Sequence, residues 1–294
     1  MSTPDKARGI IVAVDGSPAA NAAVVWAARD AAMRNVALTV FGAVVTPTAT
    51  WPPMAYPEAL AVRLEDETKK AVMHAMKIAE EAMPAEHKVT VNRELVFASP
   101  APALIEMSDE AEMIVMGTSG RGLLARGVLG SVSATVVRHA MCPVTVIHDE
   151  DLPDLQHAPV LLGVDGSPAS ERATEIAFDE ASRRGVDLVA LHAWSDVTTE
   201  VPSLDWATVE EEAQRSLAES LAGWQQRYPD VTVHRVVVRD RPARHLIDAA
   251  ESAQLVVVGS HGRGGLTGML LGSVSNTLLH SVRIPVMVAK PASA

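Results

Sequence analysis

The first half of this chain recurs in its second half, and this duplication limits the possible folds more than any other feature. Residues 12–19 read Val-Ala-Val-Asp-Gly-Ser-Pro-Ala, and residues 162–169 read Leu-Gly-Val-Asp-Gly-Ser-Pro-Ala, an offset of 150. Farther along, the offset is 142, so the second copy is eight residues shorter. A period this long indicates two similar domains, because solenoid units span only about 20–50 residues. We expect domains at 1–149 and 159–294, an acidic linker at 149–159, and the extra length in the proline-rich segment 46–57.

Each half alternates short apolar runs with helical segments. Strands are expected at 10–14, 36–44, 89–97, 113–117 and 143–148, and again at 160–164, 188–194, 231–238, 255–259 and 285–289. Helices are expected from Pro18, where Ser17 is the N-cap, at 58–83, from Pro100 and at 131–140. Apolar strands joined by helices are typical of a parallel sheet covered on both faces. The sequence therefore predicts an α/β fold with two tandem, doubly wound, Rossmann-like domains.

A glycine pattern occurs once in each half. Gly117-Thr118-Ser119-Gly120 is followed after nine residues by Gly130-Ser131, and Gly259-Ser260-His261-Gly262 is followed after nine residues by Gly272-Ser273. We call residues 117–130 and 259–272 the first and second glycine loops. Each lies between an apolar strand and a helix, where backbone N–H groups and the helix dipole favour a phosphate. Two copies with the same spacing make a nucleotide site the leading hypothesis.

The expected strand order places each glycine loop beside a second motif, the Asp-Gly-Ser-Pro segment that follows the first strand of each half. Ligands of doubly wound sheets bind beyond the carboxyl ends of the strands, where the strand order reverses. If the order is 3-2-1-4-5, Asp15 and Gly117 end neighbouring strands, as do Asp165 and Gly259. An Asp-Gly-Ser-Pro segment is also an ordinary strand-to-helix turn, and Gly-Ser before a helix is common capping. The combination in both halves favours the functional interpretation.

The residue types at this edge suggest separate roles. Glycines let the backbone approach a phosphate or ribose, the Gly-Ser pair opens a helix, and an Arg can pair with a phosphate oxygen. The aspartate is placed to accept from a ribose hydroxyl or to sit near the shell of a Mg²⁺ ion. The residues expected from this reasoning are Asp15, Gly117, Gly120, Arg121, Gly130, Ser131 and Ser133, and Asp165, Gly259, Gly262, Arg263, Gly272, Ser273 and Ser275.

Composition narrows the class of partner. The formal net charge is −11 and the isoelectric point about 5.4, which argues against a nucleic-acid partner. The chain has one cysteine, Cys142, which fits a reducing cytosol and is expected to be a small core residue. We see no signal-peptide pattern and no apolar run of the roughly 20 residues that a membrane span needs. We therefore expect a soluble, cytoplasmic protein without a membrane span.

These residues resemble the universal stress protein family in its tandem form. The Gly-x2-Gly-x9-Gly-Ser signature of the ATP-binding branch is matched in both halves, as are the opening Val-Asp-Gly-Ser and the closing Cys142-Pro-Val and Ile284-Pro-Val. The resemblance implies a five-stranded parallel sheet in the order 3-2-1-4-5 and one ATP in each domain. It also implies pairing through the last strands, as a homodimer or as a pseudo-dimer of the two halves, and a role in stress adaptation.

The resemblance also assigns nucleotide contacts residue by residue. In the first half they are Ala13, Val14, Asp15, Ala43, Met116, Gly117, Thr118, Ser119, Gly120, Gly130, Ser131, Val132 and Ser133. In the second half they are Gly163, Val164, Asp165, Ala193, Val258, Gly259, Ser260, His261, Gly262, Gly272, Ser273, Val274 and Ser275.

The two halves depart from each other at two positions of this pattern. Many members have a His before the small residue that ends strand two; the second half keeps it as His192, whereas the first has Gly42. The second half also has Asp196, placed to accept from an adenine amino group, where the first has Thr46. The two sites are therefore expected to differ in affinity.

The sequence carries no convincing catalytic apparatus. Walker A, Gly-x-Ser-x-Gly and His-Glu-x-x-His patterns are absent, and the ten His show no metal-ligand spacing. The first hypothesis is an ATP-binding signalling module that changes a surface read by an unidentified protein partner, with no enzyme activity. The alternative is a slow ATPase or another ATP-consuming enzyme.

Overall fold

The computed structural model describes residues 8–45, 58–118, 129–148, 155, 157–194, 206–262 and 271–291. The chain divides into two compact units, Met1–Leu152 and Pro153–Ala294, here the first and second domains. The division falls within the segment 149–159 that the sequence marked as a linker. The segment 46–57, where the sequence placed the extra length, lies outside the described residues.

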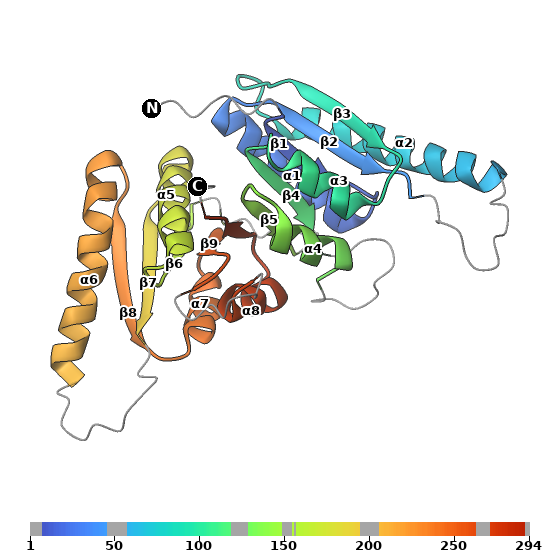
Figure 1. Ribbon diagram of the computed structural model, residues 1–294. Coiled ribbons are helices and arrows are strands. Elements are labelled where there is room, and N and C mark those ends of the chain that lie inside the picture. The colour runs from blue at the N-terminus through green and yellow to red at the C-terminus, as the bar shows by residue number, and fades with distance from the viewer. Residues whose placement is uncertain are drawn as a thin grey trace, which may run out of the picture. The chain divides into compact units, whose positions relative to one another are not determined.

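The first domain alternates strands and helices from end to end. Its elements are β1 (Ile10–Ala13), α1 (Pro18–Arg34), β2 (Leu38–Ala43), α2 (Glu58–Ala82), β3 (Val91–Val96), α3 (Pro100–Met107), β4 (Met113–Gly117), α4 (Ser131–His139) and β5 (Val144–Ile147). The strands are parallel and lie in the order β3-β2-β1-β4-β5 (Figure 1). The strand order reverses between β1 and β4, so these two strands are neighbours.

The second domain repeats this arrangement. Its elements are β6 (Val160–Val164), α5 (Pro168–Arg184), β7 (Leu188–Trp194), α6 (Trp206–Arg227), β8 (Val233–Arg239), α7 (Pro242–Ala250), β9 (Leu255–Gly259), α8 (Ser273–Ser281) and β10 (Val286–Ala289). Its parallel strands lie in the order β8-β7-β6-β9-β10. The predicted α/β class, the doubly wound topology and the order 3-2-1-4-5 are confirmed in both domains.

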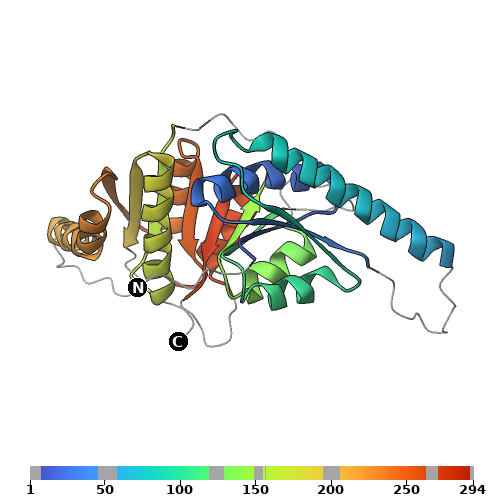
Figure 2. The ribbon, with the colours of Figure 1, turned by 90° about the horizontal axis from the view of Figure 1, so that it is seen from above.

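Helices cover both faces of each sheet. In the first domain α1 and α2 pack on one face, and α3 and α4 lie together on the other, a layering that Figure 2 shows from a second direction. The central strands β1 and β4 are buried up to their last residue because helices exclude water from both of their sides, which explains their unbroken apolar sequences. Cys142 is buried, as predicted.

The helices that follow the first strand of each domain begin and end with the same chemistry. The Ser17 hydroxyl accepts from the Ala20 N–H at 3.2 Å, with Pro18 at the first helical position. Ser167 and Pro168 repeat this start in α5. Both helices end at a residue in the left-handed conformation, Asn35 in α1 and a glycine in α5. The cap hydroxyl satisfies a backbone donor that the first turn would otherwise leave unpaired.

One core prediction is wrong. Met73, Met76 and Met83 fall on one side of the helix expected at 58–83, which predicts that all three fill the core. Only Met83 is buried, and Met73 is 54% exposed. Helix α2 instead packs through Val72, Ala75 and Ala79, which are fully buried. The small side chains let α2 approach the sheet closely and leave the Met73 position facing outward.

Candidate functional site

The aspartate that follows the first strand of each domain stabilises the turn between that strand and the next helix. An Asp15 Oδ1 atom accepts from the Ser17 N–H at 2.9 Å, and Asp165 and Ser167 repeat this bond at the same distance. The intervening glycine has φ of 81° in the first domain and 75° in the second, a left-handed conformation that favours glycine. The aspartates thus have a structural role in the turn, while they stay partly exposed at the carboxyl edge of the sheet.

The glycine that ends β4 has a packing role. A Cβ at Gly117 would lie 2.9 Å from the backbone carbon of Ala19 in α1, and a Cβ at Gly259 would lie 2.8 Å from that of Ala169 in α5. The sequence assigned these glycines to phosphate approach. The structure shows that close packing of the helix already requires them.

Each glycine loop is closed at its base by two hydrogen bonds. Gly130 N–H donates to the Thr118 carbonyl at 2.6 Å, and the buried Ser133 hydroxyl donates to the Gly117 carbonyl at 2.9 Å. In the second domain Gly272 donates to Ser260 at 2.7 Å, and Ser275 donates to Gly259 at 2.6 Å. The hydroxyls of Ser133 and Ser275, expected at phosphates, therefore give their protons to the loop itself.

The helix that follows each loop has no side-chain cap. The N-cap residues of α4 and α8 are Gly130 and Gly272, so among the described residues neither helix has the side-chain cap hydrogen bond that a serine gives to α1 and α5. Ser131, the first residue of α4, is exposed. The first-turn N–H groups of α4 and α8 therefore keep their capacity for an external acceptor, and the helix dipole favours an anion there.

These features of the first domain meet in one pocket of about 390 Å³. The predicted residues that line it are Ala13, Val14, Asp15, Ala43, Met116, Gly117, Gly130, Ser131, Val132 and Ser133. The structure therefore brings predicted residues from four separate segments together at one pocket. Predicted Thr118 is not among the lining residues and is 6% exposed, because its backbone closes the loop.

Sequence reasoning missed the apolar end of this pocket. Phe41, Val45, Pro100 and Leu104 also line it, together with Ser17 and Ala20. Pro100 and Leu104 lie four residues apart on one face of α3. That spacing was a visible signal, but it does not by itself distinguish a pocket wall from the core.

In the second domain the start of the glycine loop lies against the aspartate. A Cβ at Gly262 would collide with Asp165 Oδ2, so a larger residue there would have to displace the carboxylate. The Ser167 hydroxyl donates to the His261 carbonyl at 3.1 Å, and Ser260 Oγ lies 3.0 Å from His261 Nδ1. The predicted meeting of Asp165 with the loop is therefore present. Of the other predicted residues, Ser119, Gly120, Arg121, Asp196 and Arg263 lie outside the described part of the chain.

The histidine predicted near the second site lies on the other face of its strand. Ala43 lines the first pocket, and successive strand side chains alternate, so the Gly42 position faces away from it. A Cβ at Gly42 would lie 2.5 Å from Val72 of α2, which leaves no room for a histidine. The corresponding His192 places Nδ1 2.8 Å from the Val164 carbonyl. The Gly42 position therefore faces helix α2 rather than the pocket, whereas His192 contacts the end of the neighbouring strand β6.

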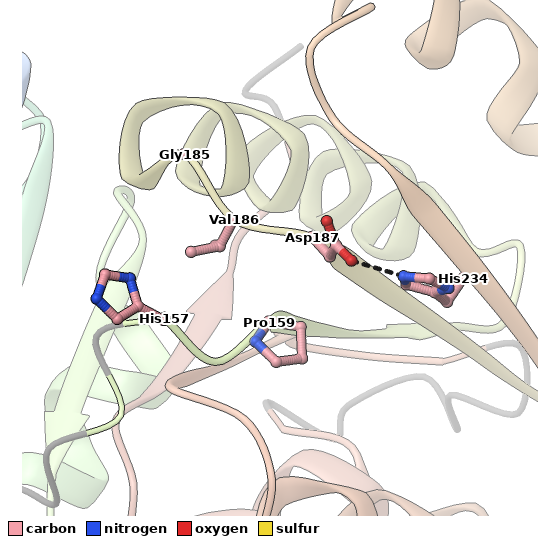
Figure 3. A pocket seen from close by; sticks show the side chains of 6 residues that line it. All are labelled: His157, Pro159, Gly185, Val186, Asp187 and His234. Atoms are coloured by element: carbon pink, nitrogen blue, oxygen red, sulfur yellow. Dashed lines mark hydrogen bonds and ion pairs between the residues drawn. The ribbon is translucent and has the colours of Figure 1, made fainter.

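A smaller pocket of about 280 Å³ lies at the opposite, amino-terminal edge of the second sheet (Figure 3). Asp187 and His234 face each other at 2.7 Å across the starts of β7 and β8, and His157 lies on the other side of Val186. Both side chains of the pair are more than half exposed, so the pair adds little stability. This edge holds none of the predicted residues.

No group of three or more His, Cys, Asp or Glu side chains in the described ranges is arranged to hold a metal ion. Among the helices of those ranges, none combines the length and the hydropathy of a membrane-spanning helix.

Fold and site together define a tandem pair of Rossmann-like domains, each with a glycine loop opposite a strand-end aspartate. The family model "Universal stress protein family" matches residues 6–148 and again residues 157–290. The chain therefore belongs to the universal stress protein family, in a form with two family domains.

Individual relatives agree with this assignment. The chain is 62% identical over 293 residues to Universal stress protein Rv2005c of Mycobacterium tuberculosis, covering 99% of each chain. It is 52% identical to Universal stress protein Rv2623 of the same organism, again over 99% of each chain. A crystal structure of a universal stress protein from Archaeoglobus fulgidus is similar with a TM-score of 0.72 and 18% identity, covering 98% of this chain and all of the other. That structural similarity shows the fold.

Proposed function

We propose that this protein is an ATP-binding stress-response protein with one nucleotide site in each domain. The observation that carries the proposal is the first pocket, where the end of β1, the end of β4 and the uncapped start of α4 meet around about 390 Å³. Nucleotide-sized ligand pockets span about 300–1,000 Å³. An apolar wall at one end and a helix N-terminus at the other match a base and a phosphate chain.

The lining residues divide by chemistry along this pocket. Phe41, Ala43 and Leu104 would hold the base, because their side chains offer apolar surface to an aromatic ring. The backbone N–H groups of α4 from Ser131 onward would hold phosphate oxygens. Asp15 lies between these ends, where a carboxylate can accept from a ribose hydroxyl or sit beside a Mg²⁺ ion carried by the phosphates. The second site would use Asp165, Ala193 and the start of α8 in the same way.

The proposed output is conformational, with little or no catalysis. Bound ATP would order each glycine loop and change a surface that an unidentified protein partner reads. The partner arrangement we propose is a homodimer or a pseudo-dimer of the two halves, in the cytoplasm, without nucleic acid. The alternative, a slow ATPase or another ATP-consuming enzyme, is favoured if turnover exceeds roughly 1 s⁻¹, which is within the ordinary enzyme range.

The decisive experiment blocks each site separately. Ala43 and the corresponding Ala193 are partly exposed at equivalent positions, so a larger side chain can extend into the site without disturbing the core. We expect ATP stoichiometry, measured by calorimetry, to fall by half in Ala43→Leu and in Ala193→Leu, and to vanish in the double variant. Unchanged stoichiometry in a folded double variant would contradict the proposal.

A second measurement separates the signalling proposal from the alternative. The purified protein is denatured without added nucleotide, and the released small molecules are identified by mass spectrometry. ATP released from both sites supports a sensor without rapid hydrolysis. ADP or AMP in place of ATP supports turnover, and steady-state kinetics then give its rate.

A further inference from the structure

The hydroxyl of Ser167 connects helix α5 to the second glycine loop. It accepts from the Ser170 N–H at 3.2 Å as the N-cap of α5, and it donates to the His261 carbonyl at 3.1 Å. The residue is only 6% exposed, so water competes little for either bond. A single buried hydroxyl therefore fixes the helix start and the loop start together.

The same turn contacts the next loop residue. The Ser167 N–H donates to Asp165 Oδ1 at 2.9 Å, which orients the carboxylate, and the other carboxylate oxygen lies against the backbone of Gly262. At the far end of the loop, Gly272 N–H is bonded to the Ser260 carbonyl. Residues 260–262 are thus held from the turn on one side and from the start of α8 on the other.

We propose that Ser167 is a positioning residue for the nucleotide site of the second domain. Its hydroxyl sets the path of residues 261–262, so that the loop N–H groups are arranged before the phosphates arrive. Preorganisation of a loop increases affinity because less ordering entropy is lost on binding. This inference rests on the proposed function, and it adds a role to a residue that the sequence identifies only as a helix cap.

Two substitutions separate the cap from the connection to the loop. Ser167→Gly removes the hydroxyl, yet glycine is itself an acceptable N-cap and destabilises a helix much less than alanine does at that position. Ser167→Thr keeps both an acceptor and a donor. The matched control is Glu171→Gly, an exposed change in the first turn of the same helix, which lowers helix stability without touching the loop.

The affinity of the second site is measured with Mg·ATP in the Ala43→Leu background, where the first site is blocked. We expect Ser167→Gly to weaken binding by about three- to tenfold, the range for one lost hydrogen bond. Ser167→Thr should restore most of the affinity, and Glu171→Gly should leave it unchanged despite a lower melting temperature. Equal or tighter binding by Ser167→Gly overturns the proposal.

A ligand-free measurement keeps this inference separate from the proposed function. Amide hydrogen exchange at residues 260–262 should be faster in Ser167→Gly than in the unaltered chain and in Glu171→Gly. If the unaltered chain binds no ATP, the proposed function fails, while faster exchange still supports the role of Ser167 in the loop. Unchanged exchange in Ser167→Gly shows that the hydroxyl does not position the loop.

Discussion

At the scale of single residues, the glycines of the Asp-Gly-Ser-Pro turns and of the glycine loops are required for several distinct physical reasons. Gly16 is needed for a left-handed turn, Gly117 for the close approach of α1, and Gly262 for contact with the Asp165 carboxylate. Only the last involves a group that faces the proposed ligand. A glycine motif read from sequence therefore mixes fold requirements with binding requirements, and variants at these positions must be interpreted accordingly.

Gly117→Ala should destabilise the fold rather than act as a clean binding variant. Its Cβ would lie 2.9 Å from the Ala19 backbone, so α1 must shift, and overpacking of this kind costs about 1–3 kcal/mol of the free energy of unfolding. The matched control is Gly223→Ala in α6, where nothing lies within 4 Å and alanine should stabilise the helix by about 0.4–1 kcal/mol. Denaturant unfolding measures both, and equal midpoints would contradict this account.

At the scale of elements, α1 and α5 end with the same buried ion pair. Arg34 pairs with Asp30 at 2.7 Å, and Arg184 pairs with Glu180 at 2.7 Å, with both carboxylates 1% exposed. A buried carboxylate is stable only when it is paired. Both halves of the chain have an arginine paired with a buried carboxylate here, although the acidic residue is Asp in one half and Glu in the other. This indicates that the pair fixes the position of the last turn of each helix against its sheet.

Arg184→Met should therefore cost about 3 kcal/mol of the free energy of unfolding, because it leaves the Glu180 carboxylate buried without this guanidinium. Arg183 provides the matched control in the same turn. It pairs with Asp179 at 2.9 Å, but both side chains are much more exposed, so Arg183→Met should cost under about 1 kcal/mol. Urea titration of the two variants tests the difference, and a similar loss in both would refute it.

An aromatic cluster lies between α5 and the C-terminal end of α6 in the second domain. Phe178 of α5 packs with Trp224 of α6 and with Tyr228, at ring-centroid distances of 6.4 and 5.9 Å. Burial raises the pKa of Tyr228 above the ordinary 10.0, and the nearby Asp179 carboxylate adds to the rise. The folded state thus favours the neutral phenol. Its contribution to stability is complete below the unfolded pKa and is lost as pH rises through the folded pKa.

Phenolate absorbance during alkaline titration tests this direction. The chain has two tyrosines, and we expect one to ionise above pH 10, with Tyr228→Phe removing that high-pH component. The tryptophan signal gives an internal control for unfolding during the titration. The assignment of the high-pH step to Tyr228 would be contradicted if Tyr228→Phe instead removed a tyrosine ionisation step at or below the ordinary pKa.

The sequence predicted the elements well where their causes are local. The buried strands β6, β7 and β9 begin and end where their apolar runs do, and the Ser-Pro starts of α1 and α5 follow from capping chemistry. Prediction failed where the cause is tertiary. Met73 has the helical spacing of a core residue, but the small residues beside it bring α2 too close to the sheet for a methionine there.

The candidate site was likewise predictable only in part. Residues placed by strand topology could be predicted, whereas residues placed by the packing of a helix could not. Asp15, Gly117 and Gly130 could be joined because parallel topology carries strand ends to one edge. Pro100 and Leu104 could not, because only the packing of α3 over that edge turns their face into a pocket wall. The double hydrogen bond of Ser167 was likewise hidden, since a cap residue in sequence gives no sign of a partner 94 residues away.

At the scale of the whole molecule, the charge of the chain opposes the ligand that the sites would bind. The formal net charge of −11 repels a nucleotide at long range, whereas the attraction of helix N-termini acts only within the last few ångströms. The two contributions respond differently to salt. The Debye length falls from about 30 Å at about 0.01 M to about 10 Å at about 0.1 M ionic strength, so salt screens the repulsion before it weakens the local contacts.

The association rate constant for Mg·ATP should therefore rise with ionic strength over this range, by roughly two- to tenfold, the reverse of the usual behaviour of phosphate-binding proteins. Stopped-flow mixing with a fluorescent ATP analogue measures it. Dissociation should change much less, because in the proposed sites the phosphates would lie against the N-termini of α4 and α8, where nearby backbone dipoles are screened little. A neutral sugar-polymer cosolute at matched viscosity controls for diffusion. An association rate that falls with salt would mean that a local positive field, and not the net charge of the chain, governs the approach of the nucleotide.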